Sequence, residues 1–254
     1  MSTDIDWTGW PDTYERVILP QVDSTMAEAA RRAPGLTMPT WILAKEQTAA
    51  RGRRGRPWVN PWGNFSATLV LNTGDTPAQS ALRSFVSSLA LYDALASVVP
   101  AEKLALKWPN DVLLGGGKVA GILLESVGGG GRSDRLSIGI GINLMQAPTM
   151  SEVETGAVPP TAVCEHTSAK LPVEGVLFEL ACAFATHEQT FRDYGFAPIR
   201  QLWLSRAARL GETVIARTGA DTIEGVFETV DDTGNLVLKT PKGPRAIAAA
   251  EVFF

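Results

Sequence analysis

The sequence predicts an α+β fold in two parts, a larger domain with a mixed sheet over residues 1–208 and a small β-barrel over residues 209–254. Two observations lead to this prediction. The larger part alternates short apolar segments with a few long stretches whose apolar residues recur at helical spacing. From Gly211 onward, closely spaced short strands are separated by polar turns, which is typical of a small barrel.

The expected strands are short apolar runs that end at turn residues. They lie at residues 18–22, 41–47, 65–72, 104–108 and 135–144, with a glycine-containing hairpin over residues 112–127. The expected long helices lie at residues 78–98, 173–194 and 197–207, whereas residues 145–171 are expected to be mostly loop. A shorter helix is expected to begin at Thr25, because Thr25 and Glu28 have the spacing of a capping box.

Composition limits the class of protein. The 254 residues are 45% hydrophobic and 20% charged with a net charge of −4, which is the balance of a soluble globular protein and favours neither nucleic acid nor an anionic membrane. No apolar run approaches the roughly 20 residues that span a bilayer. The acidic N-terminal segment lacks the features of a signal peptide. We therefore expect a cytoplasmic protein.

The cysteines and histidines offer little chemistry. Cys164 and Cys182 form no CxxC pair and are expected to be buried, reduced thiols. His166 lies in a polar loop, and His187 is expected on the surface of a helix. Two histidines leave little material for a Ser–His–Asp triad or a multi-histidine zinc site.

The most unusual segment is an arginine cluster that reads Arg51-Gly-Arg-Arg-Gly-Arg56 and is followed by Pro57 and Trp58. Such a density of like charges is favourable only in full solvent or beside an anion. Glycines allow close approach of the backbone, and guanidinium groups match carboxylate and phosphate. A solvated loop or a weak nucleic-acid patch is the alternative, but the cluster follows a strand directly, where open sheets place ligand loops.

Two further segments place polar groups at strand ends. The first is Lys107-Trp-Pro-Asn-Asp111, which closes a strand with a turn. Asn110 and Asp111 are then available to bind a ligand or a metal. The alternative is a turn with no further role. Lys118 begins an otherwise apolar strand, where it either meets solvent or stabilises an anion such as a developing acyl phosphate.

Two more segments suit the approach of a small ligand. Gly139-Ile-Gly-Ile-Asn143 removes side chains from one face of a strand and ends in a polar residue. It is not a dinucleotide fingerprint, because no helix follows at once. The hydroxyl groups in Asp23-Ser-Thr25 either cap a helix or face a polar ligand.

In this order, the five features resemble the biotin–protein ligase family. The family pattern is a DSTN-like start, a glutamine before a GRGRRGR loop, KWPND, KxxGIL and a GxGxN strand. The corresponding segments here are Asp23–Met26, Gln47 to Arg56, Lys107–Asp111, Lys118–Leu123 and Gly139–Asn143. The resemblance covers about residues 17–145, and the C-terminal barrel is similar to the family's small C-terminal domain. It implies a class II synthetase-like catalytic domain with an SH3-like barrel.

The resemblance also implies roles for individual residues. The biotin site would comprise Ser24, Thr25, Gln47, Arg51, Gly52, Arg53 and Lys118. The ATP site would comprise Arg54, Arg56, Trp58, Asn110, Lys118 and Asn143. The catalytic groups would be Lys118, Arg53 and Asp111. Mg²⁺ would be held mainly by the phosphates of ATP.

Two positions depart from the family pattern. Met26 stands where asparagine is usual, so one contact to the biotin head is missing or supplied otherwise. Ala50 replaces the first glycine of the arginine loop and restricts its backbone. Neither change removes a charged group, so we expect activity to be retained.

The expected reaction has two steps. Biotin and MgATP give biotinyl-5′-AMP and pyrophosphate, and a lysine of a carrier domain, such as the biotin carboxyl carrier of acetyl-CoA carboxylase, then displaces AMP. Asp111 is the candidate base for that lysine. No DNA or membrane partner is expected, and a homodimer is compatible with the family.

Three alternatives come from other classes. A lipoate or octanoate ligase shares the expected fold, but its RRxSGGGxVxHD-type segment is missing here. A DNA-binding biotin sensor needs an N-terminal domain of roughly 60 residues, for which the sequence before the first motif leaves no room. A non-catalytic binding protein would not need Lys118 and the arginine cluster.

Overall fold

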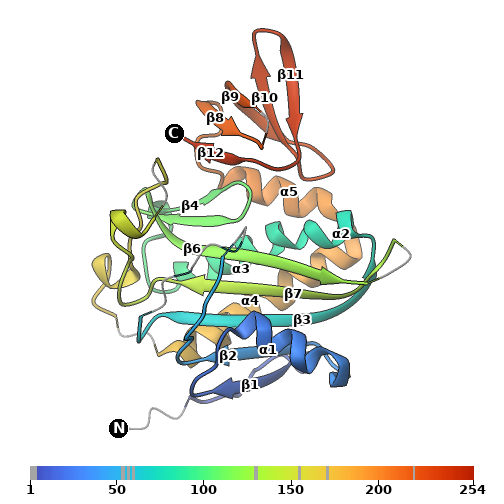
Figure 1. Ribbon diagram of the computed structural model, residues 1–254, viewed down its shortest axis with the longest axis vertical. Coiled ribbons are helices and arrows are strands. Elements are labelled where there is room, and N and C mark those ends of the chain that lie inside the picture. Colours follow the sequence, from blue (N-terminus) through green and yellow to red (C-terminus); the bar gives the residue numbers. More distant parts are fainter. Residues whose placement is uncertain are drawn as a thin grey trace.

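The computed structural model describes residues 5–52, 55, 58, 61–128, 131–153, 156–169, 172–219 and 221–254. Two sheets organise the chain (Figure 1). A seven-stranded sheet in the order β1-β2-β3-β7-β6-β5-β4 forms the centre of the larger part, and a five-stranded sheet in the order β11-β10-β9-β8-β12 forms the C-terminal part. The C-terminal part lies at the opposite end of the molecule from the N-terminus (Figure 1).

The strands of the larger sheet are β1 (Glu15–Leu19), β2 (Thr40–Ala44), β3 (Phe65–Asp75), β4 (Leu104–Lys107), β5 (Asp111–Leu114), β6 (Gly117–Val127) and β7 (Ser133–Ile142). The strands of the smaller sheet are β8 (Thr213–Arg217), β9 (Thr222–Val230), β10 (Leu236–Thr240), β11 (Gly243–Ile247) and β12 (Glu251–Phe253). The α-helices are α1 (Thr25–Arg32), α2 (Pro77–Ala81), α3 (Arg83–Ala96), α4 (Val173–Tyr194) and α5 (Phe196–Ser205). Short 3₁₀ turns are η1 (Ala33–Gly35), η3 (Ala101–Lys103), η4 (Met150–Glu152) and η5 (Val163–Glu165).

The larger sheet is mixed. Strands β1 and β2 are parallel, whereas β2 and β3, β3 and β7, and β6 and β7 pair in antiparallel register. The smaller sheet is antiparallel at each of its pairings. The α+β prediction is confirmed.

The two faces of the larger sheet carry different side chains, because successive residues of a strand point to opposite sides. On one face, Leu69 of β3 and Ile138 of β7 are fully buried in the main core with Phe184 of α4. On the other face, Val70 of β3 packs against Ala29 of α1. Figure 1 shows α1 and α4 on opposite sides of the sheet. The sheet is therefore packed on one face by the long helix α4 and on the other by the short helix α1.

The helix expected at residues 78–98 is divided at Leu82. A capping box between Thr76 and Gln79 begins α2. The N–H of Leu82 donates to the carbonyl of Gln79, three residues back, at 3.2 Å. This tighter turn separates α2 from α3, so the periodic apolar pattern predicted the packed face correctly but not the break.

Two expectations about single residues are wrong. His187 is 8% exposed rather than on the surface, because that side of α4 packs against α3, where His187 Nε2 lies 2.6 Å from Asp93 Oδ2. Neither cysteine is buried as expected: Cys164 is exposed, and Cys182 is partly exposed. Both Cys164 and Cys182 are free thiols, as expected. Among the described helices, none combines the length and the apolar character needed to cross a membrane.

The segment that leads into the C-terminal part pairs with β4, and a side-chain hydrogen bond from the turn after β4 reaches the smaller sheet. The N–H of Leu106 in β4 donates to the carbonyl of Arg206, and the N–H of Ala208 donates to the carbonyl of Leu106, both at 2.8 Å. The indole N–H of Trp108 donates to the carbonyl of Gly234 at 3.0 Å. The turn after β4 is therefore fixed to the smaller sheet.

A buried ion cluster links α3 to α4 and to the end of β3. Arg83, 5% exposed, donates from Nη2 to Glu188 Oε1 at 2.8 Å and from Nη1 to Asp75. Burial raises the pKa of the Glu188 carboxyl, and the Arg83 guanidinium opposes that rise. The cluster is stable only as a complete set, because each ion alone would be buried without compensation.

Replacing Arg83 by methionine is therefore expected to lower the free energy of unfolding by about 3–5 kcal/mol at pH 8. Without the guanidinium, the pKa of Glu188 rises further above its unfolded value. A raised folded-state pKa favours folding at low pH, and this contribution is lost as the pH rises through it. The loss in free energy of unfolding caused by Arg83→Met should therefore be smaller at pH 5 than at pH 8, as measured by urea unfolding.

Arg32→Met is the matched control, because the half-buried Arg32 pairs with Glu28 on the surface of α1 at 2.5 Å. Its loss should cost less than about 1 kcal/mol. An Arg83→Met deficit that is no larger than this, or that does not change with pH, would contradict the assignment.

Candidate functional site

A cavity of about 440 Å³ lies against the α1 face of the larger sheet. It brings together residues that the sequence analysis singled out on separate segments. Those that line it are Ser24, Thr25, Met26, Gln47, Arg51, Gly52, Trp58, Asn110, Asp111, Lys118, Gly139, Gly141 and Asn143. Arg53, Arg54 and Arg56, which were also predicted, lie outside the described residues. The volume is that of a small-molecule site.

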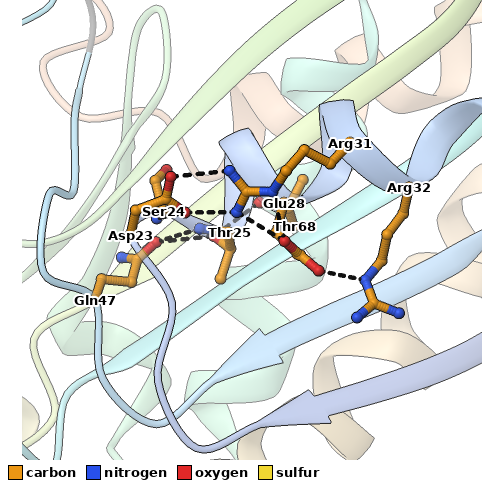
Figure 2. Close-up of polar contacts among 8 residues, drawn as sticks. All are labelled: Asp23, Ser24, Thr25, Glu28, Arg31, Arg32, Gln47 and Thr68. Carbon is orange, nitrogen blue, oxygen red and sulfur yellow. Dashed lines mark hydrogen bonds and ion pairs between the residues drawn. The ribbon is translucent and has the colours of Figure 1, made fainter.

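One end of the cavity is built on the N-terminus of α1 (Figure 2). The backbone N–H of Thr25 donates to Gln47 Oε1 at 2.7 Å, and the Thr25 hydroxyl donates to the same oxygen at 3.1 Å. The hydroxyl of Thr68 in β3 donates to Thr25 Oγ1 at 2.9 Å. Ser24 is the N-cap residue, but its side chain makes no capping bond. This end therefore presents neutral hydrogen-bonding groups.

The expected capping box between Thr25 and Glu28 is wrong. Gln47 satisfies the N–H of Thr25 instead, because β2 ends at Ala44 and the following chain pairs Val22 with Gln47 beside the helix. The strand expected to reach residue 47 is shorter for the same reason. The Glu28 carboxylate is held by Arg31 and Arg32 rather than by the helix start.

Asp23 fixes the turn that precedes α1. Its carboxylate accepts the N–H of Ser24 at 2.8 Å and two bonds from the Arg31 guanidinium at 2.6 and 2.9 Å (Figure 2). These bonds, first that from Arg31, hold the pKa of Asp23 well below its usual range. Asp23 thus stabilises the turn before α1, while the side chains of Ser24 and Thr25 face the cavity.

The floor of the cavity is formed where β6 and β7 carry glycine. A Cβ atom on Gly141 would lie 2.6 Å from Trp58 Cε2, and one on Gly121 would lie 3.3 Å from Trp58 Cζ3. A Cβ atom on Gly139 would lie 2.7 Å from Met26 Sδ. Trp58 and Met26 therefore lie directly on backbone, and larger residues at these glycines would displace them.

The charged part of the cavity is centred on Lys118. Its ammonium group lies 2.7 Å from Asp111 Oδ1 and 5.8 Å from the centre of the Trp58 ring. Lys107 Nζ lies 4.0 Å from Asp111 Oδ2. The backbone of Lys118 is held by Pro159 and Thr161, with N···O distances of 2.8 and 3.0 Å. The side chain of Lys118 is 31% exposed, so it can still meet a ligand.

Two asparagines stand beside this centre. Asn110 Nδ2 donates to the carbonyl of Ile122 at 2.5 Å, which fixes the turn after β4 to β6. Asn143 Nδ2 donates to the carbonyl of Thr161 at 3.1 Å. Within the part of the chain that the structure describes, Asn143 Oδ1 is buried without a hydrogen-bond partner. It is therefore an acceptor available to a ligand.

Part of the cavity wall was not predicted from the sequence. The segment expected to be mostly loop contributes Pro148, Val153, Val158 and Pro160, and β12 contributes Val252 and Phe253. Thr68, beneath Thr25, was also missed. These residues carry no local motif, and they lie far in the sequence from the segments that they contact. Among the described residues, no group of three or more His, Cys, Asp and Glu side chains could hold a metal ion.

Comparison with known proteins gives the family. Residues 18–143 match the model of the biotin/lipoate A/B protein ligase family, and residues 210–254 match the biotin protein ligase C-terminal domain. A biotin–[acetyl-CoA-carboxylase] ligase of Paracoccus denitrificans is 54% identical over 238 residues, which cover 93% of this chain and 99% of the relative. The bifunctional ligase/repressor BirA of Bacillus spizizenii is 32% identical, with 94% of this chain and 72% of the relative covered.

Solved structures agree with this result. The biotin protein ligase from Aquifex aeolicus in complex with biotin and ATP superposes with a TM-score of 0.79 at 26% identity, covering 94% of this chain and 97% of that one.

The chain belongs to the biotin/lipoate A/B protein ligase family. Within it, the chain is an enzyme of the biotin–protein ligase class, as the sequence motifs predicted. The predicted synthetase-like catalytic fold with a small SH3-like C-terminal domain is likewise confirmed. The alternative of a lipoate or octanoate ligase, or of a non-catalytic binding protein, receives no support from these relatives.

The pair formed by Asp23 and Arg31 should stabilise the protein only while Asp23 is ionised. Because the folded-state pKa of Asp23 is depressed, its contribution is complete above the unfolded pKa, near 3.8, and is lost as the pH falls toward the folded value. Asp23→Asn keeps an oxygen for the N–H of Ser24 but loses the charge. It should therefore unfold at a lower urea concentration than the wild type at pH 6. The difference between the two urea midpoints should become smaller below pH 4.

Asp134→Asn, at an exposed position of β7, serves as the control and should show no such narrowing. If the urea midpoint of Asp23→Asn differs from that of the wild type by the same amount at pH 6 and pH 3, the charge of Asp23 does not stabilise the protein.

Proposed function

We propose that this chain activates biotin with ATP to give biotinyl-5′-AMP and pyrophosphate, and then transfers biotin to a lysine of a biotin carboxyl carrier domain. The observation that carries this proposal is one cavity with a neutral polar end at Ser24, Thr25 and Gln47 and a cationic centre at Lys118. Such a cavity suits a ligand whose polar head is neutral and whose other end is an anion.

The polar end suits the ureido head of biotin, which has two N–H donors and one carbonyl acceptor. Ser24 and Thr25 offer hydroxyl groups, and Gln47 offers its amide NH₂ because its oxygen is already bonded to Thr25. Met26 provides an apolar wall, packed on Gly139, where the family pattern has asparagine. A thioether wall suits the sulfur-containing ring of biotin, so the substitution replaces a polar contact with an apolar one at this point.

The glycine floor suits the nucleotide. Gly121 and Gly141 leave a flat surface on which the Trp58 ring lies, and this ring provides a stacking surface for adenine. Asn143 offers its side-chain oxygen to ATP, and Asn110 orders the turn beside it. The proposal also assigns Arg51, Gly52, Arg53, Arg54 and Arg56 to a loop that covers the adenylate and its phosphates.

In the first step, an oxygen of the biotin carboxylate attacks the α-phosphorus of ATP, and pyrophosphate leaves with the electrons of the broken P–O bond. Both reactants are anions, so neutralisation of charge is the main requirement. Lys118 supplies one positive charge, and Asp111 orients it through the 2.7 Å contact. Mg²⁺ would be held mainly by the phosphates of ATP and would neutralise part of their charge, with Asp111 on the wall of the same cavity as its protein partner.

In the second step, the amine of the acceptor lysine attacks the acyl carbon, and AMP leaves. The amine must lose a proton, and Asp111 is the candidate base. Its carboxylate already faces Lys118 and Lys107, so we also assign it the role of holding Lys118 in position. The proposal also covers the whole protein. It would form a homodimer in the cytoplasm and would bind neither DNA nor a membrane. Its chain would divide between residues 208 and 209 into a catalytic domain and a small C-terminal domain.

The purified chain should release pyrophosphate from MgATP when biotin is present, and the product should label a lysine of a biotin carboxyl carrier domain. Lys118→Ala is expected to lower the rate of adenylate formation by at least about 100-fold, because no other described side chain brings a cation to the same oxygen of Asp111. Pyrophosphate release and carrier labelling are measured separately.

Lipoate and octanoate are the control substrates, and Lys242→Ala, on an exposed turn of the smaller sheet, is the control variant. Turnover with lipoate or octanoate but not with biotin would overturn the proposed function. Near-normal adenylation by Lys118→Ala would overturn the role of Lys118 alone.

Gly141→Ala tests the floor of the nucleotide site. The new methyl group would lie within 3 Å of the rigid Trp58 ring, which must then move. The KM for ATP should rise about five- to tenfold, since a shifted stacking surface costs on the order of 1–1.5 kcal/mol, while the KM for biotin changes less. Gly35→Ala is the matched control, because a Cβ atom there meets nothing within 4 Å. An unchanged KM for ATP would remove Trp58 and Gly141 from the nucleotide site.

A further inference from the structure

Thr68 lies in the middle of β3, immediately beneath the polar end of the cavity. It is completely buried and does not line the cavity itself. Its backbone pairs with Ile42 of β2 and Gly139 of β7. Its hydroxyl donates to Thr25 Oγ1 at 2.9 Å (Figure 2). A buried hydroxyl in this place is costly unless it is bonded, so its partner is informative.

The direction of each hydrogen bond in this group follows from the available protons. A backbone N–H can only donate, so the group of Gln47 that faces the N–H of Thr25 is its oxygen. The same oxygen receives the Thr25 hydroxyl proton and thereby uses both of its lone pairs. Thr25 has no second proton to offer, so Thr68 must be the donor in the bond between the two hydroxyls.

These directions determine what the cavity offers to a ligand. Thr25 Oγ1 has donated its proton to Gln47 and accepted one from Thr68, so a single lone pair remains, and it can only accept. Gln47 has used its oxygen, so its NH₂ group remains and can only donate. An acceptor beside a donor matches a ureido group, which pairs an N–H with a C=O.

We propose that Thr68 is a positioning residue for recognition of the biotin head, because it fixes Thr25 as a hydrogen-bond acceptor and thereby keeps the Gln47 amide pointing its NH₂ group at the ligand. This inference rests on the proposed function. Without the Thr68 proton, the Thr25 hydroxyl is free to rotate between Gln47 and the cavity. When it turns toward the cavity, the Gln47 oxygen keeps only the hydrogen bond from the Thr25 N–H, and the orientation of the amide is less firmly fixed.

Thr68→Val tests the proposal, because valine has the shape and the strand preference of threonine but no hydroxyl. The KM for biotin is expected to rise about three- to tenfold, which corresponds to one hydrogen bond of ordinary strength. The KM for ATP should change less than about twofold by the same reasoning, since the nucleotide does not contact this group. Thr68→Ser, which retains the hydroxyl, should restore the KM for biotin to near the wild-type value.

Thr73→Val is the matched control. Thr73 lies on the same strand, and its hydroxyl donates to the backbone carbonyl of Ser133 at 2.9 Å, away from the cavity. Its loss should leave the KM for biotin unchanged. If Thr68→Val does not fold, Thr68→Ala and Thr68→Ser provide a pair that differs only in the hydroxyl, and the same contrast is expected between them.

A double-mutant cycle distinguishes an effect through Thr25 from a general loss of packing. If Thr68 acts through Thr25, adding Thr68→Val to Thr25→Val should raise the KM for biotin no further. Desthiobiotin, which keeps the ureido group but lacks the sulfur, should show the same dependence on Thr68 as biotin.

The outcomes separate this proposal from the proposed function. If the wild-type chain does not turn over biotin, the proposed function fails. If the wild type is active and Thr68→Val leaves the KM for biotin unchanged, raises both KM values equally, or is not rescued by serine, the role of Thr68 fails alone.

Discussion

The cavity depends on a strip of one sheet face that has no side chains. Strands β6 and β7 carry Gly121, Gly139 and Gly141 on the side that faces α1, so Trp58 and Met26 lie on backbone. The opposite face of the same strands carries isoleucines that are buried against the long helices. Because side chains alternate along a strand, one pair of strands can serve the hydrophobic core and the ligand site together. Polar groups at the ends of the strip then decide what is bound.

Charge is arranged unevenly along this strip. The end at the start of α1 is neutral toward the cavity, because the charges of Asp23 and Arg31 neutralise each other outside it. The other end has Lys118 and Lys107 on either side of Asp111, a net cationic group that is partly shielded from water. A ligand with a neutral head and an anionic tail has one favourable orientation in such a field. In that orientation its carboxylate is brought to the phosphates of the nucleotide, which is the arrangement that adenylate formation requires.

The site also depends on contacts between parts of the chain that are distant in sequence. Lys118 is held by the backbone of Pro159 and Thr161, from a segment whose described residues form no regular strand or α-helix. The last strand, β12, forms part of the wall, and Trp108 ties the turn that carries Asp111 to Gly234. The C-terminal part is therefore attached both to the wall of the cavity and to the turn that orients its central lysine. A shift of the C-terminal part would therefore move the cavity wall and the turn beside Asp111.

By itself, the sequence determined the larger features of this protein. Periodic apolar patterns predicted most elements, and local motifs predicted Lys118, Asn110 and the glycine strand, because each of these depends on neighbouring residues. Tertiary structure alone decided the rest. It put Thr68 beneath Thr25, used Gln47 in place of a capping box, buried His187, exposed Cys164 and added β12 to the wall. Each of these depends on which distant segments come into contact, and that is fixed by packing and by the need to satisfy buried hydrogen-bonding groups, neither of which is written in a local pattern.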